Sequence, residues 1–437
     1  MLLKIIFYFI FLITIAASCP AQNIIDKNDP PEIQHVEFFP DERPSRIILT
    51  FEDNPATSAT VTWRTNSDVT EAKAEITTAD PSPYFNDYET DVEAKSTLLR
   101  TRNGNVLYHK VQFTGLKPAT QYLYRVTGND YRSEWFQFTT AHDNENPFRF
   151  IYLGDAQNKI FSHVSRVMRA AYAKAPDAAF VLHTGDLINH ADNDYEWEEW
   201  FRAGGFIHAQ IPTITLAGNH EFNKNALGQR SSFSKFWIPQ FNYPDNHPID
   251  TLDNQTYYFD YQQIRFIVLN SNHFIQEQTE WLDKALEEST KKWNILSFHH
   301  PVQNAVKGRQ NQNVKKLWKP VIEKHDVDLI LQGHDHSYAR GYLDEQKNGA
   351  VYVVSVAGEK MYDMDPQDWM TRKGENTQLL QIIDIDGETL TYHSYTPSGD
   401  IYDSFVLEKQ PDGKNILKET GNDFPVERTN ENTLQEK

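Results

Sequence analysis

Apolar and polar residues alternate in several short stretches between residues 46 and 140, and we find no convincing helical period among them. The stretches cover residues 47–51, 59–64, 106–113, 122–126 and 135–139. Alternation with a period of two is typical of strands that bury one face. Several such strands in succession favour a β-sandwich. The pattern therefore predicts an all-β sandwich domain over residues 44–141.

The pattern changes after the polar residues 142–146. Short apolar runs now alternate with segments whose apolar residues recur at helical spacing, as in Phe161, Val164, Val167, Met168 and Ala171. Strands are predicted at 148–153, 178–184, 211–217, 264–270, 294–298 and 328–332, and helices at 161–176, 277–289 and 313–325. Further β-rich segments cover 351–356, 379–385, 389–395 and 401–407. This order predicts a second domain over residues 146–410, with two mixed sheets packed face to face and helices outside.

Side chains that bind metals stand at the ends of the short strands. They are Asp155, Asp186, Asn219, His299, His334 and His336. Loops beyond the carboxyl ends of strands are where α/β folds place their chemistry. Carboxylate, amide and imidazole groups together suit zinc, iron or manganese better than calcium or a soft metal. One such motif occurs by chance, but five in one order predict a metal site.

The chain resembles the calcineurin-like metallophosphoesterases. This resemblance rests on five motifs: Gly154-Asp155, Gly185-Asp186, Gly218-Asn219-His220-Glu221, His299-His300-Pro301 and Gly333-His334-Asp335-His336. The first domain resembles a fibronectin-type-III-like domain, with Trp63 as the core tryptophan and residues 115–124 as the corner in which a tyrosine bonds back across a turn. The two domains together resemble the purple acid phosphatases. The implied fold is a sandwich followed by an α/β/β/α metallophosphoesterase domain.

The resemblance implies a role for each motif residue. Asp186 would bridge two metals, Asp155 and His336 would hold the first, and the second would be held by Asn219, His299 and His334. The expected cofactors are two divalent ions, zinc, manganese or iron. His220 would face the substrate phosphate and help the leaving group depart. The residues expected around the substrate or outside the ligands are His300, Tyr338 and Arg340.

Two positions depart from the purple acid phosphatase pattern. Asn189 stands three positions after Asp186, where the purple enzymes have a tyrosine. Gln157 stands where they have glycine and where the wider family often has a liganding histidine. We expect the amide oxygen of Gln157 or Asn189 to complete the first metal site, with His190 outside it. The alternative is that Tyr338 or Tyr195 replaces the missing phenol.

The implied reaction is hydrolysis of small phosphate monoesters by a metal-bound hydroxide, with His220 assisting the leaving group. One alternative is a phosphodiesterase that acts on nucleotides or phospholipids, because the metal site alone does not separate the two. Another is an inactive surface-binding protein that uses the sandwich, with aromatic residues such as Tyr84 and Tyr88, for glycan or protein contact. The oligomeric state is left open.

Charge narrows the range of partners. The chain has 42 Lys and Arg against 61 Asp and Glu, a formal charge of −19. This balance repels nucleic acid and anionic lipid, so nucleic acid binding is not expected. An anionic substrate must be attracted by cations within the site.

The first residues predict export. Residues 1–18 combine Lys4 with an apolar run that is short for a membrane span, which is typical of a secretory signal. Small residues precede Cys19, the only cysteine, and resemble a bacterial lipobox. A plain signal peptide, cut after Ser18 or Ala21, is the alternative. We expect a lipoprotein of the bacterial cell envelope, whose only membrane contact is the lipid, with a linker over 19–43 and a polar, loosely ordered tail over 411–437.

Overall fold

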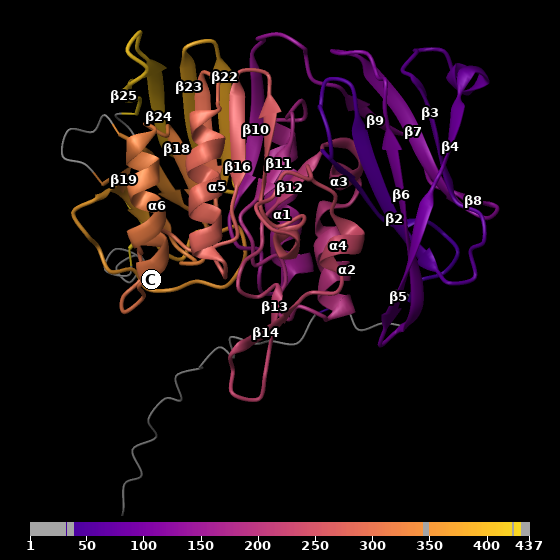
Figure 1. Cartoon of the computed structure of the whole chain (residues 1–437), viewed down its shortest axis with the longest axis horizontal. Helices are drawn as coiled ribbons and strands as arrows, with labels where there is room; N and C mark the ends of the chain where they lie inside the picture. The colour runs from indigo at the N-terminus through magenta and orange to yellow at the C-terminus, as the bar shows by residue number, and fades with distance from the viewer. Residues whose placement is uncertain (1–31, 33–38, 344–348, 422–423, 430–437) are drawn as a thin grey trace, which may run out of the picture.

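The structure is a computed structural model that describes residues 32, 39–343, 349–421 and 424–429 of the chain (Figure 1). The predicted signal segment, Cys19 and most of the linker lie outside the described residues. Within the described part, no helix is long and apolar enough to cross a membrane.

The N-terminal domain is a sandwich of two antiparallel sheets, drawn in indigo and purple in Figure 1. One sheet contains, in spatial order, β1 (Ser45–Thr50), β2 (Ala59–Asn66), β6 (Gly104–Phe113) and β5 (Lys95–Thr101). The other contains β4 (Thr90–Glu93), β3 (Lys73–Thr78), β7 (Gln121–Gly128) and β8 (Tyr131–Arg132), with β9 (Phe136–Thr139) also paired to β7. A short 3-10 turn covers Phe85–Tyr88. The predicted all-β sandwich is confirmed.

Two expected features hold the sandwich together. Trp63 is buried between the sheets, and its indole nitrogen donates a 3.0 Å hydrogen bond to the carbonyl of Thr127. The backbone nitrogen of Lys117 donates to the phenol oxygen of Tyr122 at 2.9 Å, which closes the predicted corner. Both contacts satisfy polar groups that burial would otherwise leave unpaired.

His109 is the one histidine in the sequence of this domain, and from the sequence alone we expect it on a solvent face. The structure instead buries it beside Trp63. Its two ring nitrogens lie 2.8 Å from the hydroxyl oxygens of Thr65 and Ser96. The expectation was wrong because the two hydroxyls supply partners for a polar ring inside the sandwich. The opposite face of β6 is also covered, since Tyr108 packs against the second domain.

The second domain contains two seven-stranded mixed sheets. The first has the order β12 (Thr213–Thr215), β11 (Val181–His183), β10 (Phe148–Leu153), β22 (Leu380–Asp386), β23 (Thr389–Tyr395), β24 (Ile401–Lys409) and β25 (Asn415–Glu419). The second has the order β15 (Tyr257–Tyr261), β16 (Ile264–Val268), β17 (Trp293–Ser297), β18 (Leu329–Gln332), β20 (Val351–Val354), β19 (Tyr338–Tyr342) and β21 (Met370–Gly374). These sheets confirm the predicted α/β architecture.

The helices of this domain are α1 (Ile160–Lys174), α2 (Asp194–Gly204), α3 (Phe206–Gln210), α4 (Trp237–Gln240), α5 (Ile275–Glu287) and α6 (Gln312–Lys324). Helices α1, α5 and α6 pack on the sheets of this domain, whereas α2, α3 and α4 also contact the sandwich (Figure 1). The hairpin of β13 (Phe222–Lys224) and β14 (Arg230–Phe233) projects from the lower edge in this view, and a 3-10 turn covers Asp250–Leu252.

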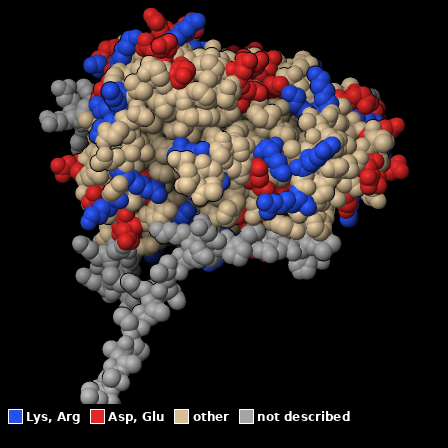
Figure 2. All heavy atoms as spheres, turned by 60° about the horizontal axis from the view of Figure 1, so that its bottom comes forward, with Lys and Arg blue, Asp and Glu red and all other residues tan. Residues whose placement is uncertain are grey.

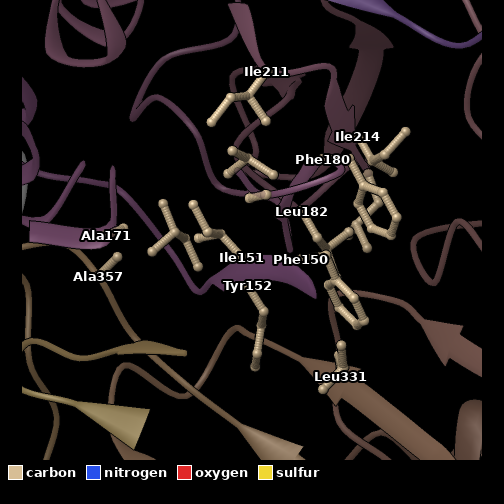
Figure 3. Close-up of a cluster of buried hydrophobic side chains, with 14 of the residues drawn as sticks. Phe150, Ile151, Tyr152, Ala171, Phe180, Leu182, Ile211, Ile214, Leu331 and Ala357 are labelled. Atoms are coloured by element: carbon tan, nitrogen blue, oxygen red, sulfur yellow. The ribbon is translucent and has the colours of Figure 1, made fainter. Parts of the chain in front are cut away.

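Successive side chains of β10 point in turn to the two layers that pack against this strand. Phe150 and Tyr152 point toward the second sheet, where Leu331 lies, whereas Ile151 points to the side on which Ala171 of α1 lies (Figure 3). The hydroxyl of Tyr152 donates to the carbonyl of Gln332 in the second sheet. The carboxyl ends of β10 and β18 are thereby held close to each other.

The polar tail is partly ordered. Residues 415–419 form β25, which pairs with β24 along its length. Our expectation of a loosely ordered extension is therefore wrong for this stretch. The strand is stable here because its backbone pairs with β24 and because Glu419 accepts hydrogen bonds of 2.8 and 2.9 Å from Arg340.

Candidate metal centre

The predicted ligands follow the carboxyl ends of strands in both sheets. Strands β10, β11 and β12 run parallel, and so do β17 and β18, so each group ends at one edge. The loops after these strands carry the six predicted ligands: Asp155, Asp186, Asn219, His299, His334 and His336. The structure thus brings together segments far apart in the sequence.

Close backbone packing explains the glycine of two motifs. At Gly185, where φ is +85°, an added Cβ would lie 2.5 Å from the backbone nitrogen of Gly218. At Gly218, an added Cβ would lie 2.2 Å from Oδ1 of Asp186. Asp186 itself has a φ of +49°, a conformation that is costly for a residue with a side chain. The two loops can approach this closely only with glycine at both positions.

Donor atoms of four predicted ligands meet at His299. Its Nε2 lies 3.3 Å from Oδ1 of Asn219, 3.1 Å from Nδ1 of His334 and 3.3 Å from Oδ2 of Asp186. Donor atoms bound to one zinc ion at about 2.0–2.2 Å lie about 3.3–3.6 Å apart in tetrahedral geometry. These four residues, which we assigned to the second metal, therefore have nearly the spacing that a shared ion requires. Burial alone would lower the pKa of His299, but the carboxylates of Asp186 and Asp155 outweigh it and raise this pKa to about 9.

The carboxylate of Asp155 shows that the first position also fits a metal. The side chain is fully buried, and neither oxygen has a hydrogen-bond partner among the described residues. Burial raises the pKa of Asp155 well above its ordinary value, and the nearby charge of His299 opposes this shift. Oδ1 lies 3.4 Å from Nδ1 of His299. A buried carboxylate without hydrogen bonds is nevertheless costly, and a cation would relieve that cost. His336 donates from Nδ1 to the carbonyl of Lys360 at 2.8 Å, which orients the ring in the way that metal-binding histidines are held.

Gln157 and Asn189 differ in which amide atom is available. Gln157 donates from Nε2 to Oδ2 of Asp186 at 2.6 Å, and its oxygen accepts a 3.0 Å hydrogen bond from Nζ of Lys360. The oxygen of Asn189 is buried and has no hydrogen-bond partner among the described residues. Of the two amides that we considered for the first metal, only that of Asn189 therefore offers an uncommitted oxygen. His190 lies outside this group, with Nδ1 at 2.6 Å from Oε1 of Glu196 and about half of its side chain exposed.

His220 is held by its backbone and by one ring nitrogen. Its backbone nitrogen donates to Oδ1 of Asp186 at 2.8 Å, and Nδ1 donates to the carbonyl of Asn189 at 2.7 Å. Burial lowers the pKa of His220, although the charge of Asp186 opposes this shift. With Nδ1 committed, Nε2 is the atom through which His220 can exchange a proton with a substrate.

His300 packs beside the second metal position. Its ring centroid lies 4.3 Å from that of His334, and its Nδ1 lies 2.9 Å from the hydroxyl of Ser271. The Nε2 of His300 lies 3.4 Å from Nη2 of Arg230. The structure therefore places His300 next to the ligands and connects it to an arginine.

Tyr338 and Arg340 do not point to the metal site, although they follow its last motif. Tyr338 donates to Oδ2 of Asp403 at 2.7 Å, and Arg340 forms a buried ion pair with Asp403 at 2.8 Å. Our expectation that both lie around the substrate is corrected to a structural role, because β19 directs them to Asp403 of the first sheet. Tyr338 is thereby committed and does not replace the missing phenol. Tyr195, the other tyrosine considered, packs against Phe39.

Sequence reasoning missed several residues of the site. Glu221 is fully buried, and its carboxylate accepts the backbone nitrogens of Asp186, Leu187 and Gly218 at 2.7–2.9 Å. Glu221 is the last residue of the motif that begins at Gly218, but the sequence analysis assigned it no role. Lys360 and Tyr362 belong to no motif. The ring centroid of Tyr362 lies 4.8 Å from that of His336.

Two arginines lie beside the histidines. Arg230 is next to His300, and Arg309 donates from Nη1 to the carbonyl of His334 at 2.5 Å and lies over the ring of Tyr362. On the face shown in Figure 2, basic side chains are interspersed with acidic ones and do not form a single patch. Attraction of an anion must therefore depend on these individual cations.

Family models match most of the described chain. Residues 148–338 match the calcineurin-like phosphoesterase family, and residues 44–140 match the purple acid phosphatase N-terminal domain. Acid phosphatase type 7 from Mus musculus is 25% identical over 342 residues, which are 71% of this chain and 73% of that protein. Purple acid phosphatase 15 from Arabidopsis thaliana is 24% identical over 351 residues, which are 70% of this chain and 63% of that protein.

Two solved structures share the fold. The purple acid phosphatase PPD1 from yellow lupin (Lupinus luteus) has a TM-score of 0.69 at 18% identity, over 85% of this chain and 75% of that one. The structure of PhoD has a TM-score of 0.65 at 13% identity, over 91% of this chain and 95% of that one.

Proposed function

We propose that this chain acts on small phosphate monoesters. It is a calcineurin-like metallophosphoesterase similar to purple acid phosphatases, which implies metal-dependent hydrolysis of phosphate esters. The observation that carries this proposal is the set of donor atoms at 3.1–3.3 Å from Nε2 of His299, next to the carboxylate of Asp155, which has no hydrogen-bond partner among the described residues. Carboxylate, amide and imidazole donors at this spacing suit zinc, iron or manganese ions.

The residues that would hold the metals are those of the candidate centre. The first position would use Asp155, His336 and the oxygen of Asn189, the second Asn219, His299 and His334, and Asp186 would serve both. Two bound cations would lower the pKa of a water molecule and neutralise charge on the phosphate oxygens. Zinc, manganese and iron all suit this donor set.

We propose that His220, with a proton on each ring nitrogen, transfers the Nε2 proton to the leaving oxygen and is left as neutral imidazole. The hydrogen bond from Nδ1 to the carbonyl of Asn189 fixes the ring and leaves Nε2 for this role. General acids of this kind contribute about 10²–10⁴-fold to a rate. The His220→Ala variant should therefore lose far more activity on an alkyl phosphate than on p-nitrophenyl phosphate, whose leaving group needs little protonation. Equal rates of the variant and the unchanged enzyme on the alkyl ester would exclude the role.

Arginine placement supports a monoester preference. A monoester dianion carries one more charge than a diester. Arg230 lies 3.4 Å from Nε2 of His300, and Arg309 donates to the carbonyl of His334. Two cationic side chains beside the histidines favour the dianion. We expect the metal-loaded enzyme to hydrolyse p-nitrophenyl phosphate at least tenfold faster, in kcat/KM, than bis(p-nitrophenyl) phosphate. The reverse order would support a phosphodiesterase, and a metal content below about one ion per chain would support an inactive binding protein.

We also propose that the protein is an exported lipoprotein. Support comes from the apolar run of residues 5–17 and from the position of Cys19 directly after small residues. Mass spectrometry of the amino terminus from the native host tests it. An unmodified amino terminus at or beyond Cys19 would contradict the lipid anchor.

A further inference from the structure

We propose that the N-terminal domain positions His220 through the first turn of α2. Helix α2 lies between the sandwich and the metal centre, and one face of its first turn binds the sandwich while the other holds the loop that orients His220. This inference rests on the proposed role of His220 in catalysis. It gives the N-terminal domain a part in the reaction without contact with substrate. We call the connection that runs from the arginines of the sandwich through α2 and the Asn189 loop to His220 the relay.

The sandwich side of the relay is a buried cluster of four charges. Arg46 of β1 and Arg64 of β2 have side chains only 1% exposed. Both bind the same two carboxylates of α2: Oδ1 of Asp194, at 2.6 and 2.9 Å, and Oε2 of Glu198, at 3.0 Å each. The cluster is neutral as a whole, and removal of any one member leaves a net buried charge.

The backbone at Arg46 is bent toward this contact. Its φ is +51°, and the pairing of β1 with β2 shifts register between Ser45 and Ile48. Bulges of this kind re-aim a side chain, and a positive φ in a residue with a side chain persists only where the surroundings compensate for it. Nη2 of Arg46 also donates to the backbone carbonyl of Asp194 at 2.7 Å, so the arginine fixes the start of α2 as well as its side chains.

The opposite side of the same turn holds the active-site loop. Asp194 and Glu198 are four residues apart and share one helix face, whereas Glu196 between them points elsewhere. The carboxylate of Glu196 accepts the backbone nitrogens of Asn189 and His190 at 2.8 and 2.6 Å. A single carboxylate thereby fixes two consecutive peptide groups of the loop.

The loop then orients the candidate acid. The carbonyl of Asn189 accepts the 2.7 Å hydrogen bond from Nδ1 of His220, so movement of this peptide would turn the imidazole. Trp197 and Trp200 of α2 are buried in the core of the second domain, which makes the helix a rigid connection. The charge cluster alone would be enough to join the two domains. Glu196 and the Asn189 carbonyl extend the connection from α2 to His220.

Hydrogen exchange of metal-free protein tests the relay without any activity measurement. The Arg46→Met variant should exchange the amides of Asn189 and His190 at least tenfold faster than the unchanged protein. The control is Arg125→Met, which removes an arginine whose ion-pair partners, Glu75 and Glu89, lie within the sandwich. If Arg46→Met does not fold, Glu198→Gln replaces it, because the amide keeps the shape and loses only the charge. Unchanged exchange at Asn189 and His190 in a folded variant, or equal acceleration in Arg125→Met, would overturn the proposal.

Kinetics of metal-loaded enzyme provide the second readout. Because the relay positions a proton donor, the folded variant should lose at least tenfold in kcat on an alkyl phosphate and less than threefold on p-nitrophenyl phosphate, with KM little changed. Equal loss on both substrates would mean that the cluster is merely structural. If the unchanged enzyme hydrolyses neither ester, the proposed function fails, and hydrogen exchange still decides the relay.

Discussion

The ammonium group of Lys360 donates a 3.0 Å hydrogen bond to Oε1 of Gln157, beside the candidate first metal position. Gln157 donates from Nε2 to Asp186 at 2.6 Å. A reversed amide would bring its N–H groups against the ammonium and its oxygen against the carboxylate, so the two charges fix its orientation. Burial lowers the pKa of Lys360, and the carboxylates of Asp186 and Asp155 oppose this shift. The buried cation Lys360 and the neutral Asn189 thus lie near the first metal position, where purple acid phosphatases have a tyrosine phenolate as a ligand.

The first prediction concerns this cation. Lys360→Met removes a positive charge that repels a metal, so the zinc affinity of one of the two sites should rise roughly tenfold, about 1.4 kcal/mol. Competition with a chelating dye measures the two dissociation constants. Lys292→Met, which removes a lysine paired with Glu145 and Glu388, is the matched control. Unchanged or weaker zinc binding in Lys360→Met would show that the lysine matters only for the position of Gln157.

The second prediction concerns colour. The purple band arises from charge transfer between a phenolate and ferric iron, and the candidate ligands include no tyrosine. Protein purified aerobically with iron should therefore lack a strong visible band, and Asn189→Tyr should introduce one. Visible spectra before and after reduction decide this. A strong band in the unchanged protein that Tyr362→Phe abolishes would contradict our ligand set and identify Tyr362, which packs against His336, as the donor.

The metal centre was predictable because each ligand can be recognised from the residues next to it in the sequence. Each predicted ligand follows a short apolar run, and the glycines are required where Asp186 and Gly218 pack against each other. Parallel strands then bring the loops to one edge, which follows from general sheet geometry. The same local reasoning misassigned Tyr338 and Arg340, because proximity to a motif in sequence does not show on which side of a strand a residue lies.

The supporting residues could not be predicted from their surroundings in the sequence. Lys360 stands 24 positions after His336, outside any motif, and meets Gln157 only through the tertiary fold. Helix α2 was missed because both sides of its first turn bind other segments, which obscures the pattern of a helix with one exposed face. Strand β25 was missed because it has only five residues, of which Ile416 and Leu417 are the two apolar ones, within a polar segment.

The third prediction separates folding from metal binding at Asp155. Burial raises the folded-state pKa of Asp155 above the ordinary 3.8, so at neutral pH the ionised side chain destabilises metal-free protein, and this penalty disappears as pH falls below 3.8. With chelator at pH 7, Asp155→Asn should be more stable than the unchanged protein by about 1–3 kcal/mol. Added zinc should raise the melting temperature of the unchanged protein much more than that of the variant. If the variant is less stable in chelator, the attraction between Asp155 and His299 outweighs the burial.

The last prediction concerns acid stability and His208. Its ring is stacked on Trp200 at 4.3 Å between centroids, and Nδ1 lies 3.2 Å from the hydroxyl of Thr213. Nε2 is buried and has no hydrogen-bond partner in the part of the chain that the structure describes. Burial lowers its pKa from 6.5 to about 3. Because the folded pKa is the lower one, the unfolded chain binds a proton more readily below pH 6.5, and the free energy of unfolding falls as pH decreases through the range from 6.5 to 3.

Between pH 7 and pH 5, His208 should reduce the free energy of unfolding by about 2 kcal/mol. The His208→Gln variant cannot take up that proton, so its urea unfolding, measured with chelator, should depend less steeply on pH even if it is less stable at pH 7. Thr213→Val disturbs the same contact but keeps the imidazole, and it should keep the original pH dependence. If His208→Gln and the unchanged protein lose stability in parallel from pH 7 to pH 5, the histidine gains a proton in the folded state, and its burial does not limit stability in acid.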